Sequence, residues 1–117
     1  MKNSRVLVAA AIAASTLSLS VPAQAALVDT NVGLVTRIFT YTTFGTGDVV
    51  ITVQTPGAGC QHGYWLRMTD AGAKTTYAQI IAWQLAEKPL RVGAFSDQRW
   101  AGSTGEYCRI DYIGTPG

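Results

Sequence analysis

The sequence predicts one small, mainly β domain with a single α-helix, built as a five-stranded Greek-key barrel. Five short runs rich in β-branched and aromatic residues are separated by breaks, most of them containing glycine or proline. Between the third and fourth runs, one stretch changes to the periodicity of an α-helix. The chain has 117 residues, so a single domain remains once an N-terminal targeting segment is set aside.

Residues 1–25 have the pattern of a cleavable secretory signal. Lys2 and Arg5 form a basic start, an uncharged apolar run follows, and Ala23 and Ala25 are the small residues that signal peptidase requires. A transmembrane anchor is the alternative, but the apolar run is shorter than the roughly 20 residues that cross a hydrocarbon core. We therefore expect cleavage after Ala25, export to the periplasm or the exterior, and no membrane span in the mature protein.

The charge of the expected mature domain, residues 26–117, is close to neutral. Without Lys2 and Arg5, seven of the nine basic residues remain, against seven acidic ones. A nucleic-acid-binding domain usually carries a clear excess of basic residues. We therefore expect no nucleic-acid partner.

Cys60 and Cys108 are the only cysteines. In an oxidising compartment they have one intramolecular pairing available, and a loop of this length stabilises a domain by about 4 kcal/mol in the chain-entropy model. Free thiols or an intermolecular bridge are the alternatives, although both are unusual in exported proteins. The sequence therefore predicts a Cys60–Cys108 disulfide.

The first strand is expected over residues 33–41, after a short leader at 26–32, and the second over residues 48–55. Both runs are β-rich and free of proline, and glycines separate them, so we expect them to form a hairpin. A break at residues 56–59, of sequence Pro-Gly-Ala-Gly, precedes the third strand at 63–68. In that strand Trp65 and Arg67 share the face opposite to Tyr64, Leu66 and Met68.

A helix is expected between residues 73 and 88. Thr76 and Gln79 have the spacing of a capping box, and Pro89 prevents the helix from continuing. Four apolar residues form one stripe along it. They are Tyr77, Ile80, Ile81 and Leu85.

The fourth strand is expected over residues 90–95 and the fifth over 106–113, with a loop at 96–105 between them. In the fifth strand, Cys108, Ile110 and Tyr112 are expected to face one way. Five strands with a helix between the third and fourth have the element order of the OB-fold, a partly open Greek-key barrel. The alternative is an open antiparallel sheet with the helix packed on one face.

No residue pattern points to an enzyme. His62 is the only histidine and lies two residues from Cys60, so neither a catalytic triad nor a zinc site can be completed from histidines and cysteines. The carboxylates are scattered, and only the fold could bring two of them together as in a glycosidase. We expect no catalytic residue, no metal and no cofactor.

Two tryptophans lie near polar donors. Trp65 shares its strand face with Arg67, and Trp100 follows Arg99 directly. Indole faces beside such donors suit the C–H surfaces of sugars, although tryptophans also close small barrels as core residues. These four residues are the candidate ligand-binding residues. Trp83 flanks the helical stripe and could cover the barrel end or lie at a subunit interface.

The stretch from Tyr77 to Val92, of sequence YAQIIAWQLAEKPLRV, resembles the helix-then-strand segment of AB5 toxin B subunits, notably the subtilase-cytotoxin and pertussis-like group. Trp100, Cys108 and Ile110 fit the same plan, which also recurs in small exported Gram-negative proteins of unknown role. The resemblance implies an exported OB-fold domain. It further implies a pentameric ring that binds cell-surface glycans and docks a catalytic A subunit.

This chain has two cysteines where the subtilase-type subunits usually have more, and their sugar-contacting loop residues have no counterpart here. The leading expectation is therefore a non-enzymatic exported binding module, with a glycan as its ligand. The alternative is a monomeric periplasmic or secreted protein-interaction factor, such as an inhibitor or an envelope accessory protein.

Overall fold

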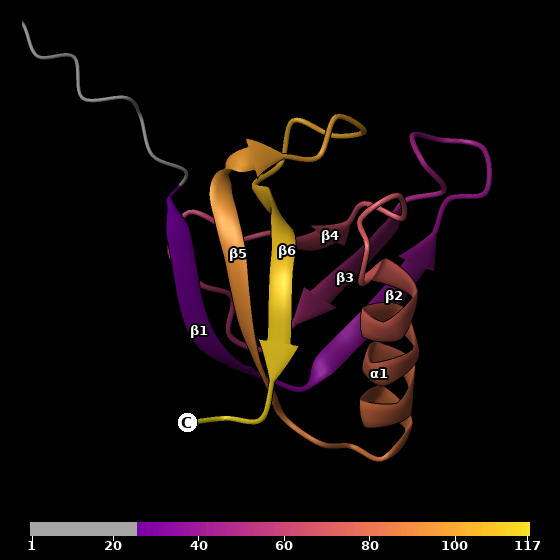
Figure 1. Ribbon diagram of the computed structural model, residues 1–117. Helices are drawn as coiled ribbons and strands as arrows, with labels where there is room; N and C mark the ends of the chain where they lie inside the picture. The colour runs from indigo at the N-terminus through magenta and orange to yellow at the C-terminus, as the bar shows by residue number, and fades with distance from the viewer. Residues whose placement is uncertain (1–25) are drawn as a thin grey trace, which may run out of the picture.

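The structure, a computed structural model, describes residues 26–117 (Figure 1). The predicted signal sequence lies outside the described residues. Within these residues, six strands and one helix make up the fold. They are β1 (Leu27–Gly33), β2 (Val35–Thr40), β3 (Val49–Val53), β4 (Gly63–Leu66), α1 (Ala73–Leu85), β5 (Leu90–Arg99) and β6 (Tyr107–Gly114).

All six strands belong to one sheet, in the order β1-β5-β6-β4-β3-β2. Neighbouring strands are antiparallel except β4 and β6, which run parallel. The sheet curves strongly, and α1 lies beside β2 at one side of it (Figure 1). The prediction of a mainly β fold with one helix is confirmed, whereas the sheet has six strands and is not closed.

β1 and β2 lie at opposite edges of the sheet although only Leu34 separates them in the chain. Gly33 has a φ of 74°, which favours glycine, and the strand register shifts on both sides of Leu34. Gln54 fixes the bend, because its backbone N–H donates to the Leu34 carbonyl and its side-chain oxygen accepts from the Leu34 N–H. The single first strand expected at 33–41 is therefore wrong, and the expected leader at 26–32 is largely β1.

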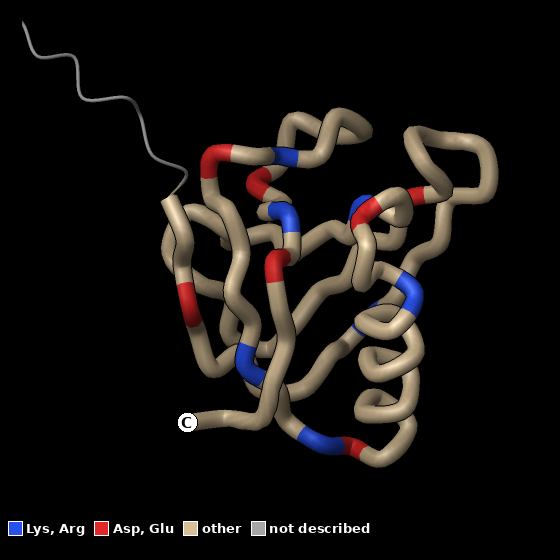
Figure 2. Tube along the Cα trace, in the orientation of Figure 1, with Lys and Arg blue, Asp and Glu red and all other residues tan. Residues whose placement is uncertain are grey.

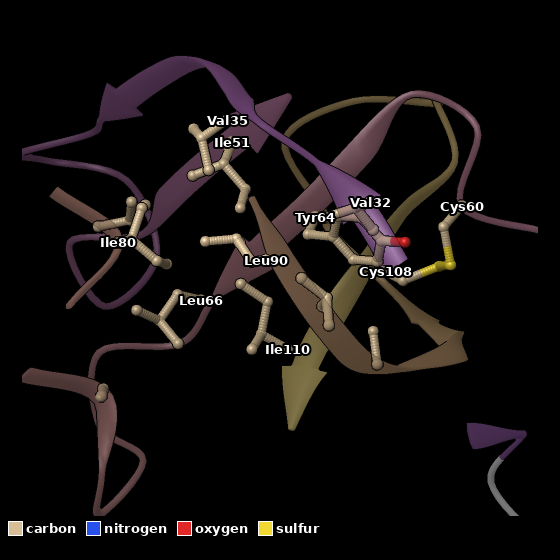
Figure 3. Close-up of a cluster of buried hydrophobic side chains, with 14 residues drawn as sticks. Val32, Val35, Ile51, Cys60, Tyr64, Leu66, Ile80, Leu90, Cys108 and Ile110 are labelled. Carbon is tan, nitrogen blue, oxygen red and sulfur yellow. A yellow bond between two sulfur atoms is a disulfide. The ribbon is translucent and has the colours of Figure 1, made fainter. Parts of the chain in front are cut away.

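The core lies on the concave face of the sheet and under α1 (Figure 3). Ile51, Tyr64 and Cys108 are fully buried on neighbouring strands, in register with one another. The Tyr64 hydroxyl accepts a hydrogen bond from the Gly57 N–H at 2.8 Å, and burial raises the pKa of Tyr64. The other buried apolar residues of this cluster include Val32, Val35, Leu66, Ile80, Leu90, Val92 and Ile110.

The predicted disulfide is confirmed. Cys60 and Cys108 are bonded, with their Cα atoms 5.4 Å apart, and both residues are fully buried. The bond joins the turn before β4 to the start of β6 (Figure 3).

The helix prediction is right in place and wrong in detail. α1 ends at Leu85, and Gly72 precedes its first turn without any side-chain cap, so the expected capping box of Thr76 and Gln79 does not form. Ile80 is fully buried, but Leu85 is 79% exposed. Each helical residue advances by about 100°, so Leu85 points some 140° away from Ile80. Trp83 packs against the core instead.

Two strands depart from their expected course. β5 continues beyond Phe95 to Arg99, so part of the expected loop at 96–105 is strand. In β6 the pairing with β5 skips Asp111, which is a β-bulge. The bulge reverses the alternation, and Tyr112 is consequently 37% exposed rather than facing inward with Ile110.

Candidate functional site

Two loops approach each other at one end of the sheet, residues 41–48 between β2 and β3 and residues 100–106 between β5 and β6. A groove of about 260 Å³ lies between them, with mostly apolar walls. All four predicted ligand-binding residues, which come from two separate segments of the chain, line this groove. Its lining is Phe44, Gly45, Thr46, Asp48, Trp65, Arg67, Arg99, Trp100 and Ala101.

Trp100 forms the buried base of the groove and is only 7% exposed. Its indole N–H donates to the Asp48 carboxylate at 2.9 Å, and that carboxylate, itself 4% exposed, also accepts from the backbone and hydroxyl of Thr46. The Tyr41 and Phe44 rings lie 5.0 and 5.5 Å from the indole, between ring centroids. Trp100 therefore fixes the 41–48 loop, and only a small part of its surface faces the groove.

Trp65 projects from β4 on the outer face of the sheet. It lies in register with Val50 on one side and Arg109 on the other. Its indole N–H donates to the Gln98 carbonyl at 2.9 Å, which ties the end of β5 to β4. Because this side chain is half-buried, part of the indole face is available to a ligand.

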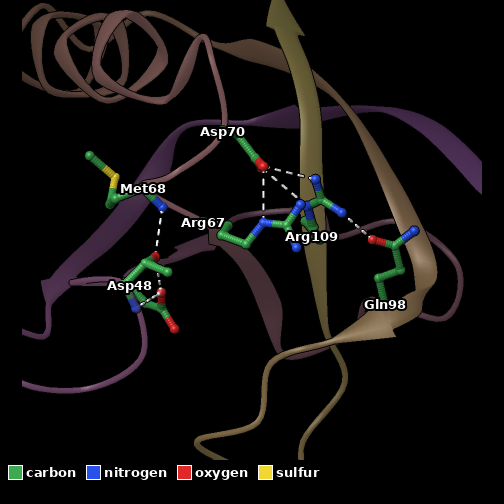
Figure 4. Close-up of polar contacts among 7 residues, drawn as sticks. Asp48, Arg67, Met68, Asp70, Gln98 and Arg109 are labelled. Carbon is green, nitrogen blue, oxygen red and sulfur yellow. Dashed lines mark hydrogen bonds and ion pairs between the residues drawn. The ribbon is translucent and has the colours of Figure 1, made fainter.

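Arg67 is held in a polar network at the side of the groove (Figure 4). Asp70 accepts from Arg67 at 2.9 Å and from two nitrogens of Arg109 at 2.9 and 3.1 Å. Arg109 also donates to the side chain of Gln98. The network thus links the segment after β4 with β6 and β5, and it sets the position of the Arg67 guanidinium.

Arg99, by contrast, is loosely held. Its side chain is 45% exposed, and its nearest acidic partner, Glu106, lies 3.5 Å away. The hydrogen bond from its Nε to the Ser96 carbonyl is also long, at 3.4 Å. Of the two guanidinium groups at the groove, that of Arg99 is therefore freer to meet an incoming ligand.

His62 does not belong to the groove lining. It is exposed, and its Nδ1 accepts a hydrogen bond from the backbone N–H of Glu106.

Within residues 26–117, no group of three or more histidine, cysteine or acidic residues has the arrangement of a metal site. Acidic and basic residues are interspersed along the chain, with neither sign gathered on one face of this view (Figure 2).

A second, more polar cleft of about 270 Å³ lies between the start of α1 and β6. Asp70 and Arg109 line it, so the network that positions Arg67 also forms its wall. Their partners lie up to 39 residues away in the chain. Sequence reasoning missed Asp48, Asp70 and Arg109 because no local pattern reports such pairings. The one available signal was strand alternation, which places Arg109 on the face opposite to Cys108 and Ile110.

In the described part of the chain, no helix is long and apolar enough to cross a membrane. No protein-family model, curated protein or solved structure matches this chain.

Proposed function

We propose that this protein is a non-enzymatic binding module whose ligand occupies the groove between the 41–48 and 100–106 loops. The observation that carries the proposal is the convergence of Trp65, Arg67, Arg99 and Trp100 on one groove. Apolar walls with a few polar groups at the rim are typical of ligand sites. The lining offers indole surface and guanidinium donors rather than an acid–base pair, which favours binding over catalysis.

A glycan is the ligand class that we propose first. The half-buried face of Trp65 suits the C–H surface of a sugar ring, and the exposed guanidinium of Arg99 is placed to donate hydrogen bonds to its oxygens. Arg67 is already engaged with Asp70, so it supplies a fixed positive edge to the groove. This arrangement supports recognition by stacking together with hydrogen bonds from arginine.

The strand order supports a more specific assignment of the fold. If β1 and β2 are the two halves of one strand, bent at Leu34, then the element order becomes that of a five-stranded OB-fold. We propose this assignment. The groove would then lie at the loops following the first and fourth strands of that fold, where OB-folds bind oligosaccharides and oligonucleotides.

The test is a glycan array probed with the wild-type chain and two matched arginine variants. Arg99→Ala removes the exposed guanidinium at the groove, whereas Arg37→Ala removes an exposed guanidinium on β2 that is outside the groove lining. For any glycan bound, we expect Arg99→Ala to weaken binding about tenfold or more, because a hydrogen bond to a charged group is lost. Arg37→Ala should bind as wild type. Equal losses in both variants, or no glycan bound, would contradict the proposal.

A protein-interaction factor is the second candidate, and the chemistry of the groove walls favours it. Both indole N–H groups are satisfied internally, by Asp48 and by the Gln98 carbonyl, so the walls present mainly apolar surface. Such a surface suits an apolar side chain of a partner protein. A groove-dependent complex with one protein, combined with an empty glycan array, would favour this candidate.

We also propose export and self-association, in the form of a homo-oligomer such as a pentamer, with or without a catalytic A subunit. The disulfide supports an oxidising compartment, and an N-terminus at Ala26 in mass spectrometry would test export.

Contact between copies is supported by Leu85, which is 79% exposed, and by the open edges of β1 and β2. We expect native mass spectrometry to detect oligomers that Leu85→Lys weakens; a strict monomer would exclude the ring.

A further inference from the structure

His62 is bonded to Glu106 through two hydrogen bonds. The His62 backbone N–H donates to the Glu106 carbonyl at 3.2 Å, and the Glu106 backbone N–H donates to Nδ1 of the imidazole at 2.8 Å. A nitrogen that accepts a hydrogen bond carries no proton of its own. The structure therefore requires the neutral imidazole, with its proton on Nε2.

The imidazole sits against the end of the 100–106 loop, whose first two residues line the groove. A Cβ added at Gly105 would lie 3.3 Å from the ring, and the Tyr107 ring lies 5.9 Å away between centroids. The charged and titratable groups placed around it are Glu106, Tyr107 and, through its ion pair with Glu106, Arg99. Glu106 thus joins His62 to the guanidinium at the rim of the groove.

We propose that His62 is a pH-sensitive latch on residues 101–106, where latch means the hydrogen bond from the Glu106 N–H to Nδ1. Protonation of the imidazole converts Nδ1 from an acceptor into a donor, so two donors face each other and the bond is lost. The latch is therefore closed while the imidazole is neutral and open once the imidazole is protonated.

The change is confined to one short segment because both of its ends are fixed elsewhere. Trp100, before the segment, is bonded to Asp48, and Cys108, shortly after it, is held by the disulfide. Opening the latch releases the Glu106 N–H, whereas the hydrogen bond from the His62 N–H to the Glu106 carbonyl remains. The inference does not rest on the identity of any ligand, and it makes the backbone of residues 101–106 sensitive to pH.

The test is nuclear magnetic resonance on the ¹⁵N-labelled chain with its disulfide intact. As acid is added and the His62 ring protons shift, we expect the Glu106 amide proton to move upfield in a single step with the same midpoint. Core resonances of β3, such as that of Ile51, should stay in place and report an intact fold. A Glu106 amide that does not follow the His62 ring would overturn the proposal.

Three variants separate the latch from other titrations. In His62→Asn, the Oδ1 atom can accept at the position of Nδ1 without titrating, so the Glu106 amide should stay at its neutral-pH position throughout. In His62→Ala, the Glu106 amide should show, at every pH, the chemical shift that it has in the wild-type chain in acid. In Glu106→Gln, which removes the nearby carboxylate, the residue 106 amide should still follow His62. A pH response that persists in His62→Asn, or disappears in Glu106→Gln, would contradict the latch.

Discussion

Trp65 and Trp100 line the same groove, yet their environments give them different roles. Trp100 is 7% exposed and bonded to a buried carboxylate, whereas Trp65 is half-buried with an indole face on the outer side of the sheet. The sequence placed both beside arginines but gave no sign that Trp100 would be the more buried of the two. The difference arises from Asp48, which is 52 positions away from Trp100 in the chain.

Trp100→Phe should destabilise the fold by about 1–3 kcal/mol, because Asp48 is left buried with one carboxylate oxygen unsatisfied. The substitution keeps an aromatic ring against Tyr41 and Phe44, so most of the packing is retained. Urea denaturation should show a lower midpoint with an unchanged slope. Trp65→Phe is the control, because the indole N–H of Trp65 bonds to a more accessible site at the sheet surface. A Trp100→Phe midpoint equal to wild type would show that the bond to Asp48 is unimportant.

The Asp29 carboxylate should make the free energy of unfolding depend on pH in the acid range. The Arg91 guanidinium, which donates two hydrogen bonds to this carboxylate, holds the pKa of Asp29 below its ordinary value of 3.8, and the Tyr112 hydroxyl adds to the effect. A depressed folded-state pKa contributes stability that is present above the unfolded pKa and is lost as pH falls through the folded one. Urea midpoints should therefore fall below about pH 4, and less steeply in Asp29→Asn.

The matched control for Asp29 is Asp97→Asn, an exposed carboxylate on β5. It should keep the wild-type acid dependence. At high pH the same cluster makes stability depend on pH in the opposite direction, because the hydrogen bond to Asp29 raises the pKa of Tyr112 above 10.0. Stability from that bond is present below the unfolded pKa of the tyrosine and is lost as pH rises through the folded one. An identical acid profile in Asp29→Asn and wild type would contradict this account.

At the scale of the elements, periodicity located the helix and most strands but misjudged which way some residues face. A helical stripe drawn through Leu85 drifts away from the side that contacts the sheet, and Leu85 lies in the final turn of α1. In β6, the bulge at Asp111 reverses the facing of Tyr112. The bulge has no local sequence signature, because it arises in the pairing with β5. The drift follows from the advance of about 100° per residue, but the sequence did not show which side of the stripe contacts the sheet.

Ile80 and Leu85 provide a direct test of the helix orientation. Ile80→Ala should cost about 2–5 kcal/mol, as expected for a large side chain truncated in a packed core. In dilute, monomeric protein, Leu85→Ala should change the free energy of unfolding by no more than about 0.5 kcal/mol, since its side chain is largely in water in the single chain. Thermal and urea unfolding of the two variants would measure this difference. Comparable losses would mean that α1 packs with the stripe expected from sequence.

At the scale of the whole molecule, the decisive pairing is the parallel contact of β4 with β6. The intervening chain contains α1 and β5, so this contact joins segments far apart in sequence. The element order predicted a Greek-key arrangement, but it did not show that the first extended run divides between the two edges of the sheet. That division depends on a bend at Gly33 and Leu34 which Gln54 stabilises from another strand.

The disulfide crosses this same junction and spans 48 positions. Closing a loop of that length stabilises the native state by about 4 kcal/mol, mainly by restricting the unfolded chain. Small domains are stable by only about 5–15 kcal/mol in total, so the bond supplies a large part of the margin. The double variant Cys60→Ala, Cys108→Ala keeps both positions apolar in the buried core, and it isolates the effect of the cross-link.

We expect this double variant to remain folded in the absence of denaturant and to unfold at a much lower urea midpoint, consistent with a loss of about 4 kcal/mol. Reductant should shift the wild-type midpoint to nearly the same value and leave that of the variant unchanged. Equal urea midpoints for the reduced wild type and the double variant would assign the loss of stability to the cross-link rather than to the substitutions. A wild-type midpoint that does not respond to reductant, once free thiols are verified, would mean that packing between β4 and β6 alone holds the two strands together.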